Sequence, residues 1–392
     1  MLQGQAALYD PQPRPSRVLA ICFNRTLVPF LRKKIGIAYR QRTGETMPEG
    51  YLHVHYFNDL MWQMARSGLW RYQPVSEGDN DQRARQYLND FKHARLEQPD
   101  VVEQCLYDAI YVDEGQDFSE EEFRLLQALC RCSGRAEANL YVFYDDAQNL
   151  YARARPNWQS LGLNVRGGRA HVMSECFRNT RQIIEPAFNV LYGTCASGTA
   201  DIPTRNFGDL STLEQKQLIA QKDGLWHVSF ARREGHAPRI STANNLKREE
   251  RELIARLEWL LVDQQVRAED VLVLTMRNER AQRLAQAIER ADLPIARVHL
   301  TTQEKDRLLG ERKQLTVSTV ASAKGYDRYC VLLASVGEFS SDVTGRASFY
   351  VGCTRAIEYL ELFGGEDAPL LAEFKVAMKR LAESRSAVGD EV

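Results

Sequence analysis

Two short apolar runs in the first half of the chain each end in carboxylates and flank a helix-forming stretch. Residues 109–114 read AIYVDE and residues 140–145 read LYVFYD. Between them, Ser119 with Glu122 three positions later matches the capping box that begins many helices. This order, in which each strand ends in an acid and a helix lies between the two strands, indicates a parallel α/β sheet. The functional sites of such sheets lie at the carboxyl ends of the strands.

The same alternation extends over most of the chain. We expect strands at residues 17–23, 51–57, 109–114, 140–145, 271–275, 315–320 and 329–336, and helices at residues 24–35, 58–65, 119–130, 247–263 and 279–291. A Gly-, Ser- and Thr-rich segment at 193–212 is the best linker candidate. We therefore expect a first lobe over 1–190 with a small insertion at about 75–100, a linker region over 191–225, and a second lobe over 226–392.

Composition narrows the class of protein further. The 392 residues include 51 Lys and Arg against 52 Asp and Glu, so the net charge of −1 argues against a globally basic nucleic-acid coat or an acidic tail protein. No apolar run is long enough to span a membrane, and the N-terminus lacks the apolar core of a signal peptide. Eight cysteines without a small-scaffold spacing favour reduced thiols. These features predict a cytoplasmic multidomain protein without a membrane partner.

The motif DEGQDF at 113–118 is the first candidate site. Adjacent Asp113 and Glu114 at the end of a buried strand can divide two tasks, since one can hold Mg²⁺ while the other orients a nucleophilic water. The alternative is a solvated turn that places acids near a helix start. A metal nuclease would need further carboxylates and a lysine converging here, and the sequence shows no obvious set.

Other candidates follow later in the chain. In DDAQNLY at 145–151, Gln148 could sense a phosphate or the attacking water and Tyr151 could stack on a base, although an ordinary turn with a core tyrosine also fits. The segments TVASAKGYD at 319–327 and YVGCTRA at 350–356 each place a cation just after an expected strand. Arg355, like Arg178 in ECFRNTRQI, could act on developing phosphate charge or could be a surface arginine near a helix start.

Taken in order, these segments resemble one family closely. FNRTL at 23–27, YF at 56–57, DEGQDF, DDAQNLY, CFRNTRQI, TVASAKGYD and YVGCTRA resemble the successive motifs of UvrD/Rep-like superfamily 1 DNA helicases. The resemblance covers about residues 17–365. It implies two RecA-like parallel-sheet lobes with ATP in the cleft between them and single-stranded or partly duplex DNA across their top. The implied activity is ATP-dependent movement along DNA with 3′–5′ polarity.

The resemblance also assigns roles to individual residues. By analogy, Asp113 holds Mg²⁺, Glu114 positions the attacking water, and Gln148 links the γ-phosphate to the DNA site. Arg178 and Arg355 reach the γ-phosphate. The residues expected near the rest of the nucleotide are Lys324, Gly325 and Asp327, with Asp327 near the ribose, where the family usually has Glu. The residues expected along the DNA path are Phe23, Asn24, Tyr56, Phe57, Tyr151 and Thr319.

One motif of the family is missing. A P-loop requires G-x-x-x-x-G-K-[ST], yet no Gly-Lys dipeptide occurs in the chain. We therefore expect a first lobe that is incomplete at its N-terminus and lacks a central strand, with a further chain or segment as a possible source of the P-loop. The alternative from another class is a non-hydrolysing DNA-binding or regulatory module derived from a helicase.

Overall fold

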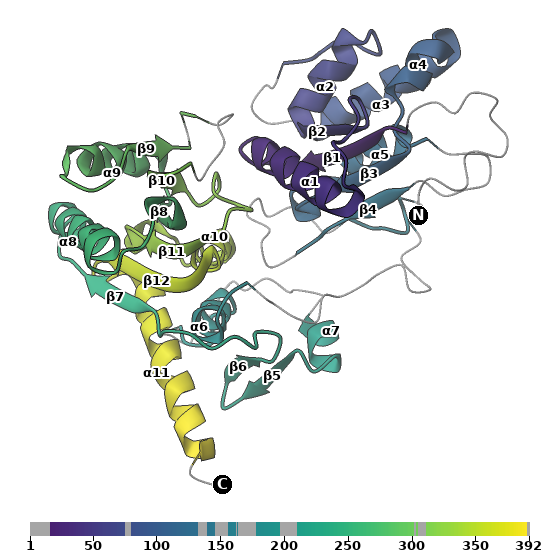
Figure 1. The fold of residues 1–392 in the computed structure, drawn as a ribbon. Coiled ribbons are helices and arrows are strands. Elements are labelled where there is room, and N and C mark those ends of the chain that lie inside the picture. The colour runs from purple at the N-terminus through teal and green to yellow at the C-terminus, as the bar shows by residue number, and fades with distance from the viewer. Residues whose placement is uncertain are drawn as a thin grey trace. The chain divides into compact units, whose positions relative to one another are not determined.

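The computed structural model describes residues 16–74, 80–131, 139–145, 156–161, 163, 178–196, 210–301, 303–304 and 311–389. The chain divides into two compact units (Figure 1). Unit 1 comprises residues 1–145 and 154–165, and unit 2 comprises residues 146–153 and 166–392. Each contains a parallel β-sheet, so the α/β class is confirmed and is consistent with RecA-like lobes.

The sheet of unit 1 has the strand order β2-β1-β3-β4. Its strands are β1 (Val18–Cys22), β2 (Leu52–Tyr56), β3 (Ala109–Val112) and β4 (Leu140–Val142), all paired in parallel. These four strands pair in an unbroken series, without the central gap that the sequence led us to expect. A further strand could therefore join this sheet only beyond β2 or β4.

Helices follow the strands of unit 1 as parallel connections require. They are α1 (Leu27–Thr43), α2 (Phe57–Arg66), α3 (Asn80–Glu97), α4 (Pro99–Cys105), the 3₁₀ turn η1 (Gly115–Asp117) and α5 (Glu120–Ala128). The predicted capping box is present, because the Ser119 hydroxyl accepts from Glu122 N while the Glu122 carboxylate accepts from Ser119 N. Alternate residues of β1 and β3, such as Leu19 and Ile110, join α2, α3 and α5 in one apolar core.

Unit 2 contains a six-stranded sheet of order β7-β12-β11-β8-β10-β9. The strands are β7 (Arg239–Thr242), β8 (Val271–Thr275), β9 (Arg297–Leu300), β10 (Gln314–Thr319), β11 (Arg328–Leu333) and β12 (Ala356–Gly364), again all parallel. An antiparallel hairpin of β5 (Ile219–Lys222) and β6 (Leu225–Val228) lies apart from this sheet.

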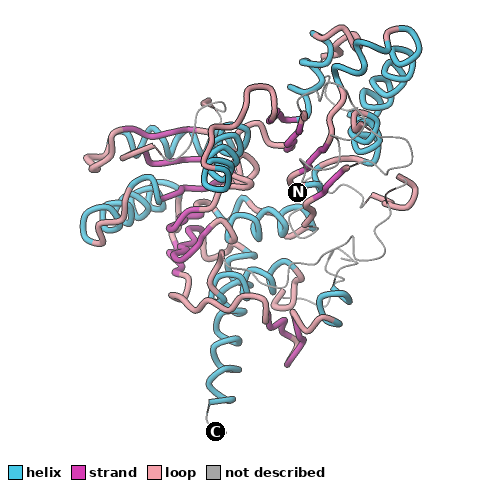
Figure 2. The backbone as a smooth tube through the Cα atoms, turned by 45° about the vertical axis from the view of Figure 1, so that its right-hand side comes forward, coloured by secondary structure: helices cyan, strands magenta, loops and turns pink. Residues whose placement is uncertain are grey.

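Two apolar cores cover the two faces of the larger sheet. Val271 and Val273 of β8 pack with α8 (Leu246–Glu258), the π-helical turn η3 (Trp259–Asp263) and α9 (Asn278–Arg290). Leu272 and Leu274, which point the other way along the same strand, pack with α6 (Arg181–Leu191), α10 (Val343–Cys353) and α11 (Pro369–Gly389). The remaining elements are α7 (Leu210–Gln215), η4 (Ala268–Asp270) and η5 (Val336–Glu338). The long helix α11 leads to the C-terminus (Figure 2).

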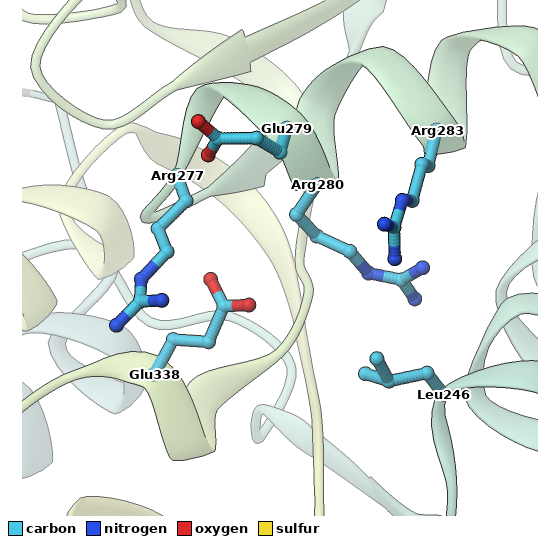
Figure 3. Close-up of a pocket in the computed structure, with 6 residues that line it drawn as sticks. All are labelled: Leu246, Arg277, Glu279, Arg280, Arg283 and Glu338. Carbon is cyan, nitrogen blue, oxygen red and sulfur yellow. The ribbon is translucent and has the colours of Figure 1, made fainter.

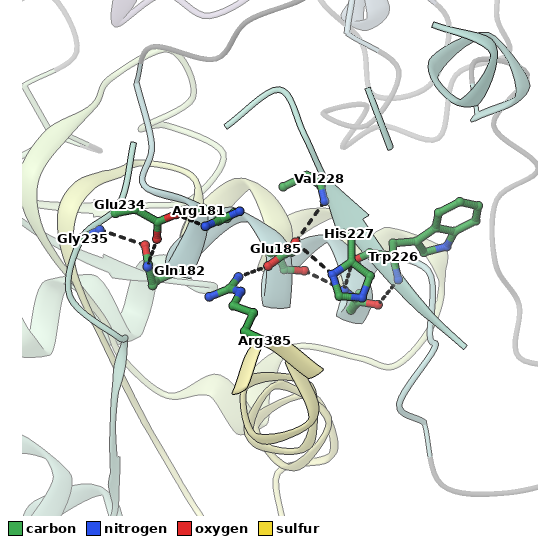
Figure 4. Close-up of polar contacts among 10 residues, drawn as sticks. Arg181, Gln182, Glu185, Trp226, His227, Val228, Glu234, Gly235 and Arg385 are labelled. Carbon is green, nitrogen blue, oxygen red and sulfur yellow. Dashed lines mark hydrogen bonds and ion pairs between the residues drawn. The ribbon is translucent and has the colours of Figure 1, made fainter. Parts of the chain in front are cut away.

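The unit boundary differs from the expected lobe boundary at 190. Helix α6 packs within unit 2, where its buried Glu185 accepts hydrogen bonds from Val228 N at 3.0 Å and from Arg385 of α11 (Figure 4). The described part of the expected linker region, 191–225, contains α7, β5 and the first residue of β6. The expected insertion contains α3, whose Tyr87 and Phe91 are buried in the core of unit 1.

One element was predicted wrongly. The segment YVGCTRA does not begin in a strand, because residues 350–353 form the end of helix α10 and Arg355 lies between that helix and β12. The run is apolar and short, and such runs do not distinguish a buried helix from a buried strand by periodicity. Arg355 therefore follows a helix, and its position depends on the turn that joins α10 to β12.

Candidate functional site

Asp113 and Glu114 lie at the carboxyl end of β3, between the ends of its neighbours β1 and β4. The Asp113 backbone continues the ladder and donates to Ile21 O at 2.8 Å. Burial, followed by the negative charges of Asp113 and Glu114, raises the pKa of the Cys22 thiol at the end of β1. The structure thus brings both predicted carboxylates to one edge of the parallel sheet, where α/β proteins place their sites.

The Glu114 carboxylate is held by a neighbouring amide. Glu114 adopts a left-handed backbone conformation with φ of 52°, and Gln116 Nε2 donates to its Oε2 at 2.5 Å. The other end of the Gln116 amide, Oε1, accepts from Asp145 N at 2.9 Å. Gln116 is almost fully buried, so it joins the carboxyl ends of β3 and β4 and orients Glu114.

Close packing at this edge also explains the glycine of the motif. Gly115 N donates to Phe143 O at 2.7 Å, and a Cβ at Gly115 would lie 2.5 Å from Val142 Cγ1. A larger residue would have to shift the Val142 side chain, and its Cβ would also lie 3.1 Å from the backbone oxygen of Phe143. Glycine therefore allows the strand after DEGQDF to approach the two carboxylates.

Three predicted DNA-contacting residues lie at the ends of β1 and β2. Phe23 is partly buried and packs edge-to-face on Phe118 with ring centroids 5.8 Å apart. Tyr56 is also partly buried, and the Arg25 guanidinium lies over its ring at 5.8 Å. The Asn24 side-chain oxygen accepts from Thr26 N and Oγ1, which fixes the turn before α1.

Phe57 is placed differently from its neighbours. Its side chain is only 4% exposed and belongs to the core of unit 1. Its ring packs edge-to-face on Phe118 with centroids 6.1 Å apart. Phe57 is therefore a core residue in this structure, while Tyr56, the residue before it, retains partial exposure.

In unit 2, Arg178, Asp327 and Arg355 form one charged cluster. Asp327 Oδ2 lies 2.7 Å from Arg178 Nε, and Asp327 Oδ1 lies 3.3 Å from Arg355 Nη1. The exposed fractions of the side chains are 47% for Arg178, 18% for Asp327 and 0% for Arg355. The structure thus brings the two predicted arginines to the same carboxylate from positions far apart in the sequence.

The predicted nucleotide residues Lys324, Gly325 and Asp327 follow β10, and the predicted DNA residue Thr319 is the last residue of that strand. Thr319 ends the strand and is nearly buried, and its hydroxyl accepts from Ser322 N at 3.2 Å. Lys324 is buried, and Gly325 has a φ of 85°, which glycine adopts without strain. This turn directs the chain into Asp327, so its geometry sets where that carboxylate lies.

A pocket of about 250 Å³ lies at the carboxyl ends of β8 and β11 (Figure 3). It is lined by Leu246, Arg277, Glu279, Arg280, Arg283 and Glu338. Helix α9, which follows β8, packs on one face of the sheet, whereas α10, which follows β11, packs on the other. Adjacent strands with connections to opposite faces define the crevice where open α/β sheets bind ligands.

The pocket combines cations with a partly buried acid. Arg280 is paired with the buried Glu249 at 3.0 Å and with Ser335 Oγ at 3.0 Å. Arg277 and Arg283 are exposed and have no ion-pair partner among the residues that the structure describes. Burial raises the pKa of Glu338, and the nearby Arg277 and Arg280 oppose that shift. Among the described residues, the pocket therefore offers two exposed arginines without an ion pair beside an acceptor.

Two predicted residues, Gln148 and Tyr151, lie outside the described residues. Two other residues were missed by the sequence analysis, Gln116 and Asn179. Gln116 stands within DEGQDF, so an amide next to two acids was a visible signal. Asn179 gave no such signal, because its contacts are to backbone far along the chain: its side-chain amide donates to Thr354 O and Ala356 O.

The histidines of β2 have ordinary polar partners. His55 Nδ1 lies 2.5 Å from Asp59 Oδ2, and His53 Nδ1 lies 3.3 Å from the Tyr107 hydroxyl. Within the described ranges, no group of three or more His, Cys, Asp or Glu side chains is arranged to hold a metal ion. A metal in this chain would therefore need ligands beyond such a cluster, as Mg²⁺ does when it binds nucleotide phosphates and water.

Comparisons with known proteins find similarity only among solved structures. Neither the protein-family models nor the curated proteins contain a match to this chain. Among solved structures, the fold is similar to the C-terminal domain of a possible DNA helicase from Lactobacillus plantarum WCFS1, with a TM-score of 0.35 and 16% identity. The similarity covers 52% of this chain and 96% of that one. A likeness this weak does not by itself identify a family or an activity. None of the described helices is long and apolar enough to cross a membrane.

Proposed function

We propose that this chain is the core of an ATP-dependent DNA helicase or translocase of the UvrD/Rep type. The observation that carries the proposal is the carboxylate pair at the end of β3. Asp113 and Glu114 lie together at the carboxyl edge of a parallel sheet, and the buried Gln116 fixes the Glu114 carboxylate. A fixed carboxylate beside a second one is the arrangement that metal-assisted phosphoryl transfer to water requires.

The donor set fits Mg-ATP at this edge. Mg²⁺ in nucleotide sites takes one or two protein carboxylates and completes its shell with phosphates and water, so Asp113 suffices as the protein ligand. When bound, Mg-ATP supplies the phosphoanhydride that is cleaved. Glu114 would orient the attacking water and accept its proton, and Gln116 would keep the Glu114 carboxylate in the orientation for that transfer.

The arginine cluster of unit 2 supports the same reaction. Arg178 and Arg355 present guanidinium groups to a single carboxylate, and the same groups could bind phosphate oxygens in fixed geometry. In this proposal they stabilise the charge that develops on the γ-phosphate. Lys324, Gly325 and Asp327, in the turn after β10, would then lie near the rest of the nucleotide.

DNA would run over the carboxyl edges of the sheets. In unit 1, Phe23, Asn24 and Tyr56 lie at the ends of β1 and β2, where aromatic rings can stack on bases. In unit 2, Thr319 ends β10, and the exposed Arg277 and Arg283 can meet phosphates. The 3′–5′ direction of movement follows from the family resemblance and is part of the proposal.

A second candidate function has its own support. The sequence has no Gly-Lys dipeptide, so the 392 residues contain no P-loop motif of the form G-x-x-x-x-G-K-[ST]. This favours a DNA-binding or regulatory module that does not hydrolyse ATP. The two functions share the DNA site and differ only in turnover.

ATP turnover by the purified chain, with and without single-stranded DNA, separates the two. The proposal predicts DNA-stimulated turnover that Glu114→Gln abolishes, because the amide cannot accept the proton of water. Glu97→Gln is the matched control, since Glu97 is exposed at the end of α3 and the substitution removes the same charge.

The alternative predicts a different pair of results. Single-stranded DNA would bind with strong salt dependence, and no turnover would be seen in the wild-type chain under any condition. Turnover that survives Glu114→Gln would overturn the assignment of Glu114. If the wild-type chain neither binds single-stranded DNA nor hydrolyses ATP, both functions are excluded.

A further inference from the structure

Asp327 occupies the position between two guanidinium groups that an anionic ligand would take. Its carboxylate lies 2.7 Å from Arg178 and 3.3 Å from Arg355, one oxygen toward each arginine. A phosphate group presents oxygens of the same charge to arginines in the same way. The chain itself therefore supplies the anion for its own arginine pair.

The three segments that carry these side chains are fixed to one another. Asn179, next to Arg178, donates its two amide hydrogens to Thr354 O at 2.7 Å and Ala356 O at 2.6 Å, the residues that flank Arg355. Arg328 N, next to Asp327, donates to Arg355 O at 3.0 Å. Two side-chain bonds from Asn179 and one backbone bond thus hold together the segments that carry the arginine pair.

Burial distinguishes Arg355 from the other two members of the cluster. Arg355 is fully buried and also donates from Nε to Val351 O at 3.2 Å, so its guanidinium is held from two sides. Asp327 is partly exposed and carries its carboxylate on a short side chain with two rotatable bonds. Displacement of the Asp327 carboxylate would free the Nη1 atom of Arg355 from the contact that it now makes with Asp327 Oδ1.

We propose that Asp327 is an internal competitor: it holds the Arg178–Arg355 pair in the ligand-free chain, and a phosphate group binds to the pair by displacing it. This inference rests on the proposed role of the two arginines in phosphate binding. It adds that Asp327 lowers the affinity of the arginine pair for phosphate. The pair is shielded from stray anions, and only a ligand with several negative charges competes well with a tethered carboxylate.

The proposal predicts a gain of affinity when Asp327 is neutralised. Asp327→Asn keeps the shape of the side chain and removes the competing charge, so inorganic triphosphate should bind about three- to tenfold more tightly than to the wild-type chain. Asp327→Ser, which is smaller and also neutral, should change the affinity in the same direction. A carboxylate that only stabilised the fold would give no gain on removal.

The test is a calorimetric titration of the full chain with inorganic triphosphate, which has neither ribose nor base. A ribose contact by Asp327 therefore cannot affect the result. Asp263→Asn is the matched control, because Asp263 is an exposed acid of unit 2 in η3 and its loss changes the net charge equally. Circular dichroism of each variant verifies that it is folded.

The outcomes distinguish this inference from the function on which it rests. Tighter binding by both Asp327 variants, with Asp263→Asn equal to wild type, supports the internal competitor. Wild-type binding that is unchanged or weakened by Asp327→Asn and Asp327→Ser overturns it and leaves the arginine site intact. Absence of triphosphate binding in the wild type and all variants overturns both the competitor and the arginine site.

Discussion

The side-chain amide of Asn179 donates a hydrogen bond to the backbone oxygen of Thr354 at 2.7 Å, although 175 residues separate the two in the sequence. A second bond from the same nitrogen reaches Ala356 O. Asn179 is nearly buried, so both bonds are sheltered from water. Because Asn179 follows Arg178 and the two acceptors flank Arg355, these bonds fix the distance between the backbone at Arg178 and the backbone at Arg355.

Asn179→Asp should destabilise unit 2 by roughly 2–4 kcal/mol. The substitution keeps the size of the side chain, removes both N–H donors and faces a carboxylate toward two carbonyl oxygens in a buried position. Urea unfolding followed by circular dichroism measures the change. Asn244→Asp is the control, because Asn244 is exposed, and it should shift the free energy of unfolding by less than about 0.5 kcal/mol. Equal effects of the two variants would contradict the role of Asn179.

The free energy of unfolding of unit 1 should depend on pH in part through His53. Burial, followed by the positive charge of Arg17 and then His55, lowers the pKa of His53 to about 4. An unfolded histidine titrates near 6.5, so between about pH 6.5 and pH 4 the unfolded chain binds a proton that the folded chain does not. The stabilisation is therefore complete above pH 6.5 and is lost as the pH falls toward 4.

Nuclear magnetic resonance titration of the imidazole signals measures the pKa of His53 directly. The unfolding free energy should also fall less between pH 7 and pH 5 in His53→Gln than in the wild-type chain. His93→Gln, at an exposed position of α3, should leave the pH dependence unchanged. A His53 signal that titrates near 6.5 would refute the prediction.

Arg277→Ala and Arg283→Ala should each weaken binding to single-stranded DNA. Both arginines line the pocket at the start of α9, and a guanidinium that neutralises a phosphate releases counterions. Each substitution should also reduce the slope of log affinity against log salt by about 0.7–1. Fluorescence anisotropy with a labelled thymidine oligonucleotide over a salt series measures both quantities.

Arg290→Ala provides the control for that series. Arg290 is exposed on the same helix, but it lies in the last turn and does not line the pocket. Its loss should leave the salt slope unchanged. If the three variants behaved alike, the effect would come from net charge and not from the pocket.

Ser119→Ala should cost about 1 kcal/mol of the stability of unit 1. The Ser119 hydroxyl accepts from Glu122 N at 3.2 Å, and alanine would leave that donor of the first helical turn without its cap. Ser67→Ala, at an exposed position after α2, removes a bond to the preceding turn and a contact with the Cys105 thiol but no helix cap, and should change stability by less than about 0.5 kcal/mol. Denaturant unfolding of both variants compares them, and a larger loss for Ser67→Ala would contradict the assignment.

Local chemistry made much of the fold predictable. The capping box of Ser119 and Glu122 and the fully buried strand at 271–275 appear where the sequence places them, because both depend on residues a few positions apart. Asp113 and Glu114 likewise lie at the end of β3, since a buried strand followed by acids defines that position from its own pattern. These features need no knowledge of the rest of the chain.

Tertiary structure decided the features that depend on distant partners. An apolar run such as residues 350–353 is compatible with strand or helix, and its packing as the end of α10 settles the choice. Phe57 and Tyr56 are both aromatic, yet only the packing on Phe118 assigns Phe57 to the core.

The sequence by itself determined the α/β class and the carboxylate pair at the end of β3, because short-range hydrogen bonding and side-chain periodicity specify both. Only the tertiary structure decided that Asp327 meets Arg178 and Arg355, and that α6 packs within unit 2. The physical reason is that such contacts join segments far apart in the sequence, and the local sequence of one segment does not specify which other segment it will contact. They form when burial of apolar faces brings those segments together, and polar side chains then pair with whichever partners that packing supplies.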